Sequence, residues 1–213
     1  CALPILMAHT AMRLLLKIAD ENGKHDTMNN VAIKFMIVGD GPLMQKVKKV
    51  LSQLSTKLLE NIRFYDSVHY TDAYDVTLAS DVTFLPSVME RIPTSFFEAM
   101  SVGNVIVGAN VGAINELVKD GVTGTLLKTN KQVLEGRSLV PGESNFNEAV
   151  EFYLKALLDL CYDKSKYNRM SSATLSTIPQ FGFSHTANLI STKLRNIVKK
   201  VKSTRTNLSP TQT

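Results

Sequence analysis

The chain of 213 residues is long enough for one hydrophobic core, and its 44% hydrophobic and 20% charged residues are ordinary for a soluble globular protein. No apolar run approaches the roughly 18 residues that span a bilayer, and no signal peptide is visible. Two cysteines, Cys1 and Cys161, are too few for a disulfide framework or a zinc knuckle, which favours a reducing, cytoplasmic compartment.

The formal net charge of +5 comes from the C-terminal end of the chain. No Asp or Glu follows Ser171, and six basic residues do: Lys193, Arg195, Lys199, Lys200, Lys202 and Arg205. The rest of the chain holds 18 of the 24 basic residues and all 19 acidic ones, so it is nearly neutral. This end is either a solvated helix or a contact with an anionic membrane surface. We expect no nucleic-acid partner, because neither a binding motif nor interleaved aromatic residues accompany the charge.

Helices and strands alternate along the first 120 residues. Apolar residues at helical spacing predict a helix over 4–20, and a short apolar run bounded by glycine predicts a strand over 33–38. Pro42 fits the first turn of a helix that continues to about Glu60. Three further strands, each followed by a helix, are predicted at 62–65, 71–79, 82–85, 95–102, 104–107 and 113–119. This alternation predicts an α/β fold, a Rossmann-like parallel sheet with helices on both faces, whose ligands bind beyond the carboxyl ends of the strands.

The pattern changes after Gly124. Residues 128–144 read as a long polar loop, and helices are predicted at 146–162, 164–175 and 184–202. We therefore expect one domain over 1–203 and a polar, disordered tail over 204–213. Because the chain begins with Cys1 instead of methionine, we also expect a fragment or a processed product.

Two glutamates bracket a turn where the strand 82–85 gives way to a helix, in the stretch ERIPTSFFE at 90–98. One interpretation of Glu98 is structural: Ser95 and Glu98 have the spacing of a capping box. In the other, the first backbone N–H groups of the helix, near Thr94 and Ser95, bind a phosphate. Glu90 and Glu98 would then accept hydrogen bonds from hydroxyl groups of a sugar and a ribose. A nucleotide-sugar carries all these groups.

Five segments over residues 35–127 carry a resemblance to a known family. They read IVGDGP, IRFYDSV, SDVTFLPS, ERIPTSFFEAMSVGNVIV and NVGAINELVKDGVTGTLL, in that order. Together they resemble the donor-binding half of retaining glycosyltransferases with the GT-B fold, the large family 4 group, whose signature is an E-x7-E segment. The resemblance implies a sugar transferred from a nucleotide-sugar to an acceptor (a glycan, a lipid or a small molecule) with retention of configuration and without a metal or other cofactor.

The resemblance also implies roles for single residues. Glu90 would bind hydroxyls of the donor sugar near the reaction centre, and Glu98 would bind the ribose. The amides of Thr94 and Ser95 would hold the diphosphate. Three residues of neighbouring loops would approach the nucleotide: Gly39 and Gly41, which keep the first loop close, and Val68, which lies against the base.

The chain departs from the family pattern at three residues and in one absence. One of the three residues is Asn115, which replaces a common proline. Arg91 stands where glycine is usual, and we expect its side chain to point to solvent; Asn104 also replaces a common glycine. The diphosphate clamp and the N-terminal, acceptor-binding half expected as a partner have no counterpart in this sequence. Two alternatives therefore stay open: a non-catalytic nucleotide-binding fragment or degenerate paralogue, and a GT-B sugar-nucleotide epimerase.

Overall fold

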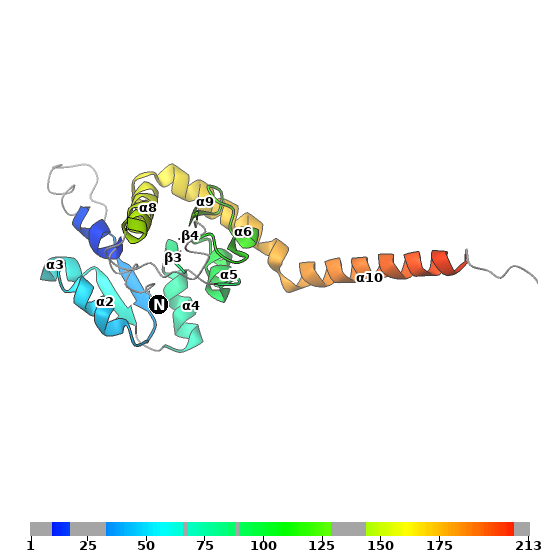
Figure 1. The fold of residues 1–213 in the computed structure, drawn as a ribbon, viewed down its shortest axis with the longest axis horizontal. Coiled ribbons are helices and arrows are strands. Elements are labelled where there is room, and N and C mark those ends of the chain that lie inside the picture. Colours follow the sequence, from blue (N-terminus) through cyan, green and yellow to red (C-terminus); the bar gives the residue numbers. More distant parts are fainter. Residues whose placement is uncertain (1–9, 18–32, 66–67, 88–89, 129–143, 207–213) are drawn as a thin grey trace, which may run out of the picture. The chain divides into compact units, whose positions relative to one another are not determined.

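The computed structural model describes residues 10–17, 33–65, 68–87, 90–128 and 144–206, with side chains up to Lys199 in the last helix (Figure 1). The chain divides into two compact units, Cys1–Leu175 and Ser176–Thr213. The first holds the strands, and the second contains the short 3-10 helix η1 (Ile178–Phe181) and the long helix α10 (Phe183–Thr206).

The strands of the first unit are all parallel, which confirms the α/β prediction. β1 (Phe35–Val38) pairs with β2 (Ile62–Tyr65), whereas β3 (Val82–Leu85), β4 (Val105–Ala109) and β5 (Gly124–Leu127) form a second sheet in that order. One continuous sheet was expected, but the described strands are hydrogen-bonded in two groups. An apolar run predicts that a strand exists but does not identify the strand that pairs with it. The division of the strands into two groups was therefore not predictable from the sequence.

β4 is the central strand of its sheet and is covered on both faces. All five of its residues are buried, as expected for a strand in a parallel sheet between helices. Val105 and Val107 share a core cluster with α8 (Ser144–Tyr162). Side chains alternate along a strand, so Gly108 faces the other way, where α5 (Thr94–Ser101) brings Phe96 against it.

The core is continuous across the two sheets. One cluster joins α8, β4 and Met170 of α9 (Lys164–Thr177), and a second joins the helix over residues 10–17 to Val47, Leu51 and β2. Phe35 of β1 packs against both clusters. The two groups of strands therefore share one apolar interior.

β5 lies unusually close to β4. Gly124 is the register partner of Ile106, and a Cβ added to Gly124 would lie 2.5 Å from the carbonyl oxygen of Ile106 and 2.7 Å from Val118 Cγ1. A glycine is therefore required here by space alone.

The predicted helix from Pro42 to Glu60 is wrong as a single element. It is divided into α2 (Met44–Leu51) and α3 (Thr56–Leu59), since Ser52 ends the first and Ser55, with extended backbone, begins the second. Serine hydroxyls compete with helical hydrogen bonds, and that of Ser52 bonds to the carbonyl of Lys49 at 2.8 Å. The interruption also turns Leu54 into the core, where it is buried.

The other helices after residue 60 lie close to their predicted positions. Of the helix predicted over 4–20, residues 10–17 are helical, and the rest lies outside the described residues. α4 (Tyr70–Leu78), α5 and α6 (Ile114–Leu117) follow β2, β3 and β4 in turn, as an alternating pattern requires. α10 extends to Thr206, three residues into the predicted tail, and the end of that tail lies outside the described residues.

Candidate functional site

Glu90 lies in the loop that follows β3 and is held by a buried hydroxyl. Ser87, only 2% exposed, donates its Oγ hydrogen to Glu90 Oε1 at 3.0 Å. Glu90 itself is half-buried, so one carboxylate oxygen is oriented by the protein while the group stays accessible. Residues 88–89, between the two, lie outside the described ranges.

The backbone of this loop is fixed by the turn between β4 and α6. The N–H of Ala113 donates to the carbonyl oxygen of Arg91 at 2.9 Å. Gly112 adopts a φ of 56°, and a Cβ added there would collide with the carbonyl oxygen of Glu90. Gly112 is thus a positioning residue for Glu90 that the sequence analysis did not single out, although it lies in one of the quoted segments. Arg91 is exposed, as expected.

The helix after Glu90 begins one residue earlier than predicted, and the capping box does not form. Pro93 is the N-cap of α5, with no side-chain cap hydrogen bond, so Ser95 lies inside the helix instead of at its cap. Thr94 and Ser95 are both exposed in the first turn, where backbone N–H groups have no acceptor within the helix. The structural interpretation of Glu98 is thereby removed.

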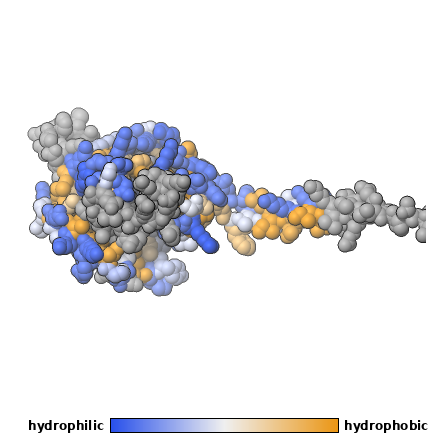
Figure 2. Space-filling model, in the orientation of Figure 1, coloured by the Kyte–Doolittle hydropathy of each residue, from blue (hydrophilic) through white to orange (hydrophobic). Residues whose placement is uncertain are grey.

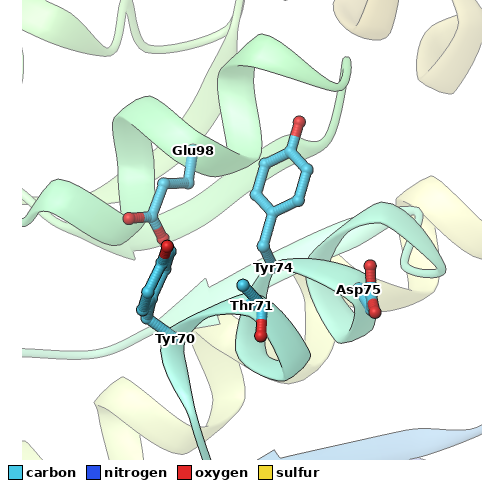
Figure 3. Close-up of a pocket in the computed structure, with 5 residues that line it drawn as sticks. All are labelled: Tyr70, Thr71, Tyr74, Asp75 and Glu98. Atoms are coloured by element: carbon cyan, nitrogen blue, oxygen red, sulfur yellow. The ribbon is translucent and has the colours of Figure 1, made fainter.

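Glu98 instead lines a pocket of about 380 Å³. The other lining residues come from α4: Tyr70, Thr71, Tyr74 and Asp75 (Figure 3). The carboxylate of Glu98 points toward the side chain of Tyr70, which is 77% exposed. The pocket arises because α4, which follows β2, packs against α5, which follows β3.

Asn104 links α4 to the sheet beneath this pocket. It is 2% exposed, and its Nδ2 donates to the carbonyl oxygen of Thr77 at 2.9 Å and to Thr83 Oγ1 at 3.2 Å. The residue that departs from the family's glycine therefore has a structural role, which its position before a strand did not reveal.

The loop after β1 is open around both of its glycines. Gly39 has a φ of 138° and donates its N–H to the carbonyl oxygen of Tyr65 at 2.9 Å, and the carbonyl oxygen of Gly41 accepts the N–H of Met44 at 3.0 Å. Apart from the adjacent residues, no described residue has an atom within 4 Å of a Cβ placed at either glycine. Val68 is half-buried between β2 and α4.

The structure thus places the two acids on either side of one turn, but in different surroundings. Glu98, alone among the predicted site residues, is a described lining residue of the pocket; Glu90, Gly39, Gly41 and Val68 are not. Tyr70 and Tyr74 were not predicted, because tyrosines on a polar helix look like surface residues. Within the described residues, no group of three or more His, Cys, Asp or Glu side chains could hold a metal ion.

The chain matches the profile of a known family. The profile of the family described as "Glycosyl transferases group 1" matches residues 6–135, which is more than half of the chain.

Curated relatives each match about half of the chain. A galactosyltransferase of Escherichia coli, named UDP-Gal:alpha-D-GlcNAc-diphosphoundecaprenol alpha-1,3-galactosyltransferase, is 34% identical over 96 residues, 45% of this chain and 24% of its own length. A putative colanic acid biosynthesis glycosyltransferase, WcaL of Salmonella typhimurium, is 29% identical over 119 residues, 54% of this chain and 29% of its own length. The chain therefore spans under a third of the length of these relatives.

Solved structures share the fold at lower identity. The pneumococcal O-GlcNAc transferase GtfA, in complex with UDP and GlcNAc, superimposes with a TM-score of 0.63 at 13% identity, over 87% of this chain and 32% of that one. Anabaena Alr3699/HepE, in complex with UDP and glucose, gives a TM-score of 0.54 at 22% identity, over 86% of this chain and 44% of that one. These likenesses show a common fold.

Proposed function

The chain belongs to group 1 of the glycosyl transferases, and from this membership we propose that it forms the donor-binding part of an enzyme that transfers a sugar from a nucleotide-sugar to an acceptor. We further assign it to the retaining, E-x7-E type, family 4 group, on the spacing of Glu90 and Glu98. None of the curated relatives described above is named as an epimerase.

The observation that carries the proposal is the state of Glu98. Its helix has no capping box, and its carboxylate lines an open pocket together with two tyrosines and a threonine. A carboxylate in such a place accepts hydrogen bonds from ligand hydroxyls, and a neighbouring aromatic ring offers a face for a sugar or a base. We place the ribose of the donor at Glu98.

We assign the diphosphate and the transferred sugar to the residues from Glu98 back to Glu90, and the base to neighbouring loops. The exposed first turn of α5 holds the diphosphate through the amides of Thr94 and Ser95. Glu90, oriented by Ser87, binds hydroxyls of the transferred sugar. Gly39 and Gly41 leave the first loop free of side chains on the nucleotide side, and Val68 lies against the base.

We propose uridine diphosphate as the nucleotide. The solved structures of the pneumococcal transferase and of the Anabaena protein contain UDP, and the Escherichia coli relative is named for UDP-Gal. The acceptor is a glycan or a lipid-linked glycan, and its choice is a property of the whole protein.

The transfer itself breaks the bond between the anomeric carbon and a diphosphate oxygen. A bond from the same carbon to an acceptor hydroxyl oxygen forms on the same face of the sugar, and the proton of that hydroxyl passes to the leaving diphosphate. Glu90 stabilises the orientation of the sugar during this exchange, and the dipole of α5 stabilises the negative charge that develops on the diphosphate.

Calorimetric titration of the 213-residue chain with UDP, GDP and ADP tests the proposal. We expect saturable binding of UDP in preference to the other two. Glu98→Gln should weaken UDP binding about tenfold or more, because hydrogen bonds to a charged group are worth about 1.5–3 kcal/mol.

Glu60→Gln is the matched control. Glu60 is also an exposed glutamate, but it precedes β2 and so lies at the opposite, amino end of a parallel strand. UDP affinity should not change in this variant. Absence of nucleotide binding by the wild-type chain, or equal loss in both variants, would contradict the donor site.

A further inference from the structure

The segment that builds the proposed donor site carries a single basic side chain of the Lys or Arg type. Between Arg63 and Lys119 the sequence contains no Lys or Arg other than Arg91. The same stretch contains seven acidic residues, and Glu90 and Glu98 are two of them. This stretch provides α4, the loop after β3 and α5, so the elements around the donor site are acidic apart from Arg91.

An acidic site is a poor place for a diphosphate unless a positive charge is added to it. The proposed function assigns the diphosphate to the first turn of α5, close in the chain to the carboxylates of Glu90 and Glu98. The backbone N–H groups of a helix N-terminus supply partial charges equivalent to about half an elementary charge. A full positive charge beside them increases the affinity for a diphosphate, because opposite charges attract strongly where water is partly excluded.

Arg91 lies at the end of α5 to which the diphosphate is assigned. Pro93 is the N-cap of this helix, so Arg91 precedes the cap by two residues and Thr94 by three. The backbone of Arg91 is held in place by the N–H of Ala113, which donates to its carbonyl oxygen at 2.9 Å. The side chain therefore starts from a fixed point next to the first turn of the helix.

The side chain of Arg91 is available for a ligand. It is exposed, and within the described part of the chain it forms no ion pair. Figure 2 shows hydrophilic residues over much of the visible face of the first unit, so exposure alone does not single out a charged residue. Arg91 is distinguished by its place in an acidic segment, beside the turn where an anion is expected.

We propose that Arg91 binds the diphosphate of the nucleotide-sugar, with its guanidinium group donating hydrogen bonds to phosphate oxygens. The planar fork of an arginine matches the geometry of a phosphate and can donate to two of its oxygens at once. Sugar hydroxyls carry no charge, and Glu90 is already assigned to them, so the cation acts on the phosphate. The inference rests on the proposed donor site and adds a residue that stabilises the charge developing on the leaving diphosphate.

Calorimetric titration of the 213-residue chain with UDP tests the inference. Arg91→Gln should weaken UDP binding about tenfold or more, because hydrogen bonds between two charged groups are among the strongest. Arg91→Lys keeps the charge but loses the fork, so its affinity should lie between those of wild type and Arg91→Gln. Both variants change an exposed side chain and should therefore fold, which circular dichroism can verify.

Arg169→Gln is the matched control. Arg169 is also exposed, and Tyr167, two residues earlier in α9, donates its hydroxyl hydrogen to Asp81 at 3.1 Å. Asp81 directly precedes β3, so this part of α9 lies toward the amino ends of the strands, away from the donor site. The two variants remove the same charge from the chain. UDP affinity in Arg169→Gln should stay within about twofold of wild type.

Phosphorus NMR of bound UDP reports the contact itself. At saturating UDP, Arg91→Gln should move the resonance of at least one phosphate group relative to wild type, because its oxygens lose hydrogen bonds. Glu98→Gln, which is assigned to the ribose, should leave both phosphate resonances close to their wild-type positions although it weakens binding.

Three results would overturn the inference and leave the donor site standing. The first is wild-type UDP affinity in Arg91→Gln while Glu98→Gln binds weakly. The second is equal loss of affinity in Arg91→Gln and Arg169→Gln, and the third is unchanged phosphate resonances in Arg91→Gln. Failure of the wild-type chain to bind UDP would overturn the donor site and this inference together.

Discussion

Gly112 is the residue on which the position of Glu90 depends most directly. Its positive φ strains any other residue, and the space for a Cβ is occupied by the carbonyl oxygen of Glu90. We predict that Gly112→Ala destabilises the protein by about 3 kcal/mol or more, because the clash adds to a backbone penalty of about 1–2 kcal/mol. Urea unfolding followed by circular dichroism measures the difference.

Gly121→Ala separates the two causes. Gly121 also has a positive φ, 76°, but apart from its chain neighbours no atom of the described part of the chain lies within 4 Å of its Cβ position. This variant should lose only the backbone penalty, about 1–2 kcal/mol. Equal destabilisation by the two substitutions would show that the Glu90 loop moves aside at little cost.

We expect the thiol of Cys161 to react slowly, because its pKa is raised. Burial, followed by the nearby negative charge of Asp81, raises the pKa of its thiol from 9.0 to about 11. We predict that in a Cys1→Ser variant, iodoacetamide at pH 8 modifies Cys161 about 100-fold more slowly in the folded than in the urea-unfolded chain, because only the thiolate reacts. The rate should rise tenfold per pH unit up to about pH 11. A rate that levels off near pH 9 would contradict the raised pKa.

At the scale of elements, the pocket depends on how α4 is held against the sheet. Asn104 bonds at once to the last turn of α4, through the carbonyl of Thr77, and to β3, through Thr83. Asn104→Ala leaves these groups without their donor in a buried place. We predict a loss of about 1–3 kcal/mol in the free energy of unfolding. In Asn115→Ala, at an exposed position of α6, the loss should stay below about 0.5 kcal/mol, and a similar loss in both would contradict the bridging role.

The elements that the sequence predicted best are those whose boundaries have a local cause. β2 and β3 occupy the predicted residues, and α5 ends where Gly103, with a φ of 85°, supplies the left-handed residue that closes a helix. The error at residues 42–60 also has a local cause. Ser52 ends α2 and Ser55 begins α3, but the helical periodicity of the surrounding residues led to the prediction of one continuous helix.

The site was less predictable because it depends on packing between elements. The pair Glu90 and Glu98 is visible in the sequence, since both acids belong to one short segment. Tyr70 and Tyr74 reach Glu98 only because α4 packs against α5, and no local pattern encodes that contact. For the same reason, the sequence shows that residue 112 is a glycine, but its contact with the backbone of Glu90 can be seen only in the fold.

At the scale of the whole molecule, the proposed donor site belongs to one of the two units. The pocket residues lie in Cys1–Leu175, and α10 belongs to Ser176–Thr213. We predict that a chain ending at Gly182 retains UDP affinity within about twofold, because the pocket is lined by side chains of the first unit alone. Calorimetric titration of the shortened chain with UDP measures this affinity. Loss of nucleotide affinity in the shortened chain would show that the first unit needs α10 in order to fold.

The close approach at Gly124 has a consequence for the alignment of β5. A parallel strand can in principle pair one residue out of step with its neighbour, which exchanges its two faces. Such a slip would bring Thr123 or Thr125 opposite Ile106, and either would force a Cβ into the carbonyl oxygen that Gly124 alone can approach. Gly124 therefore permits only one alignment of β5 with β4, because it has no Cβ.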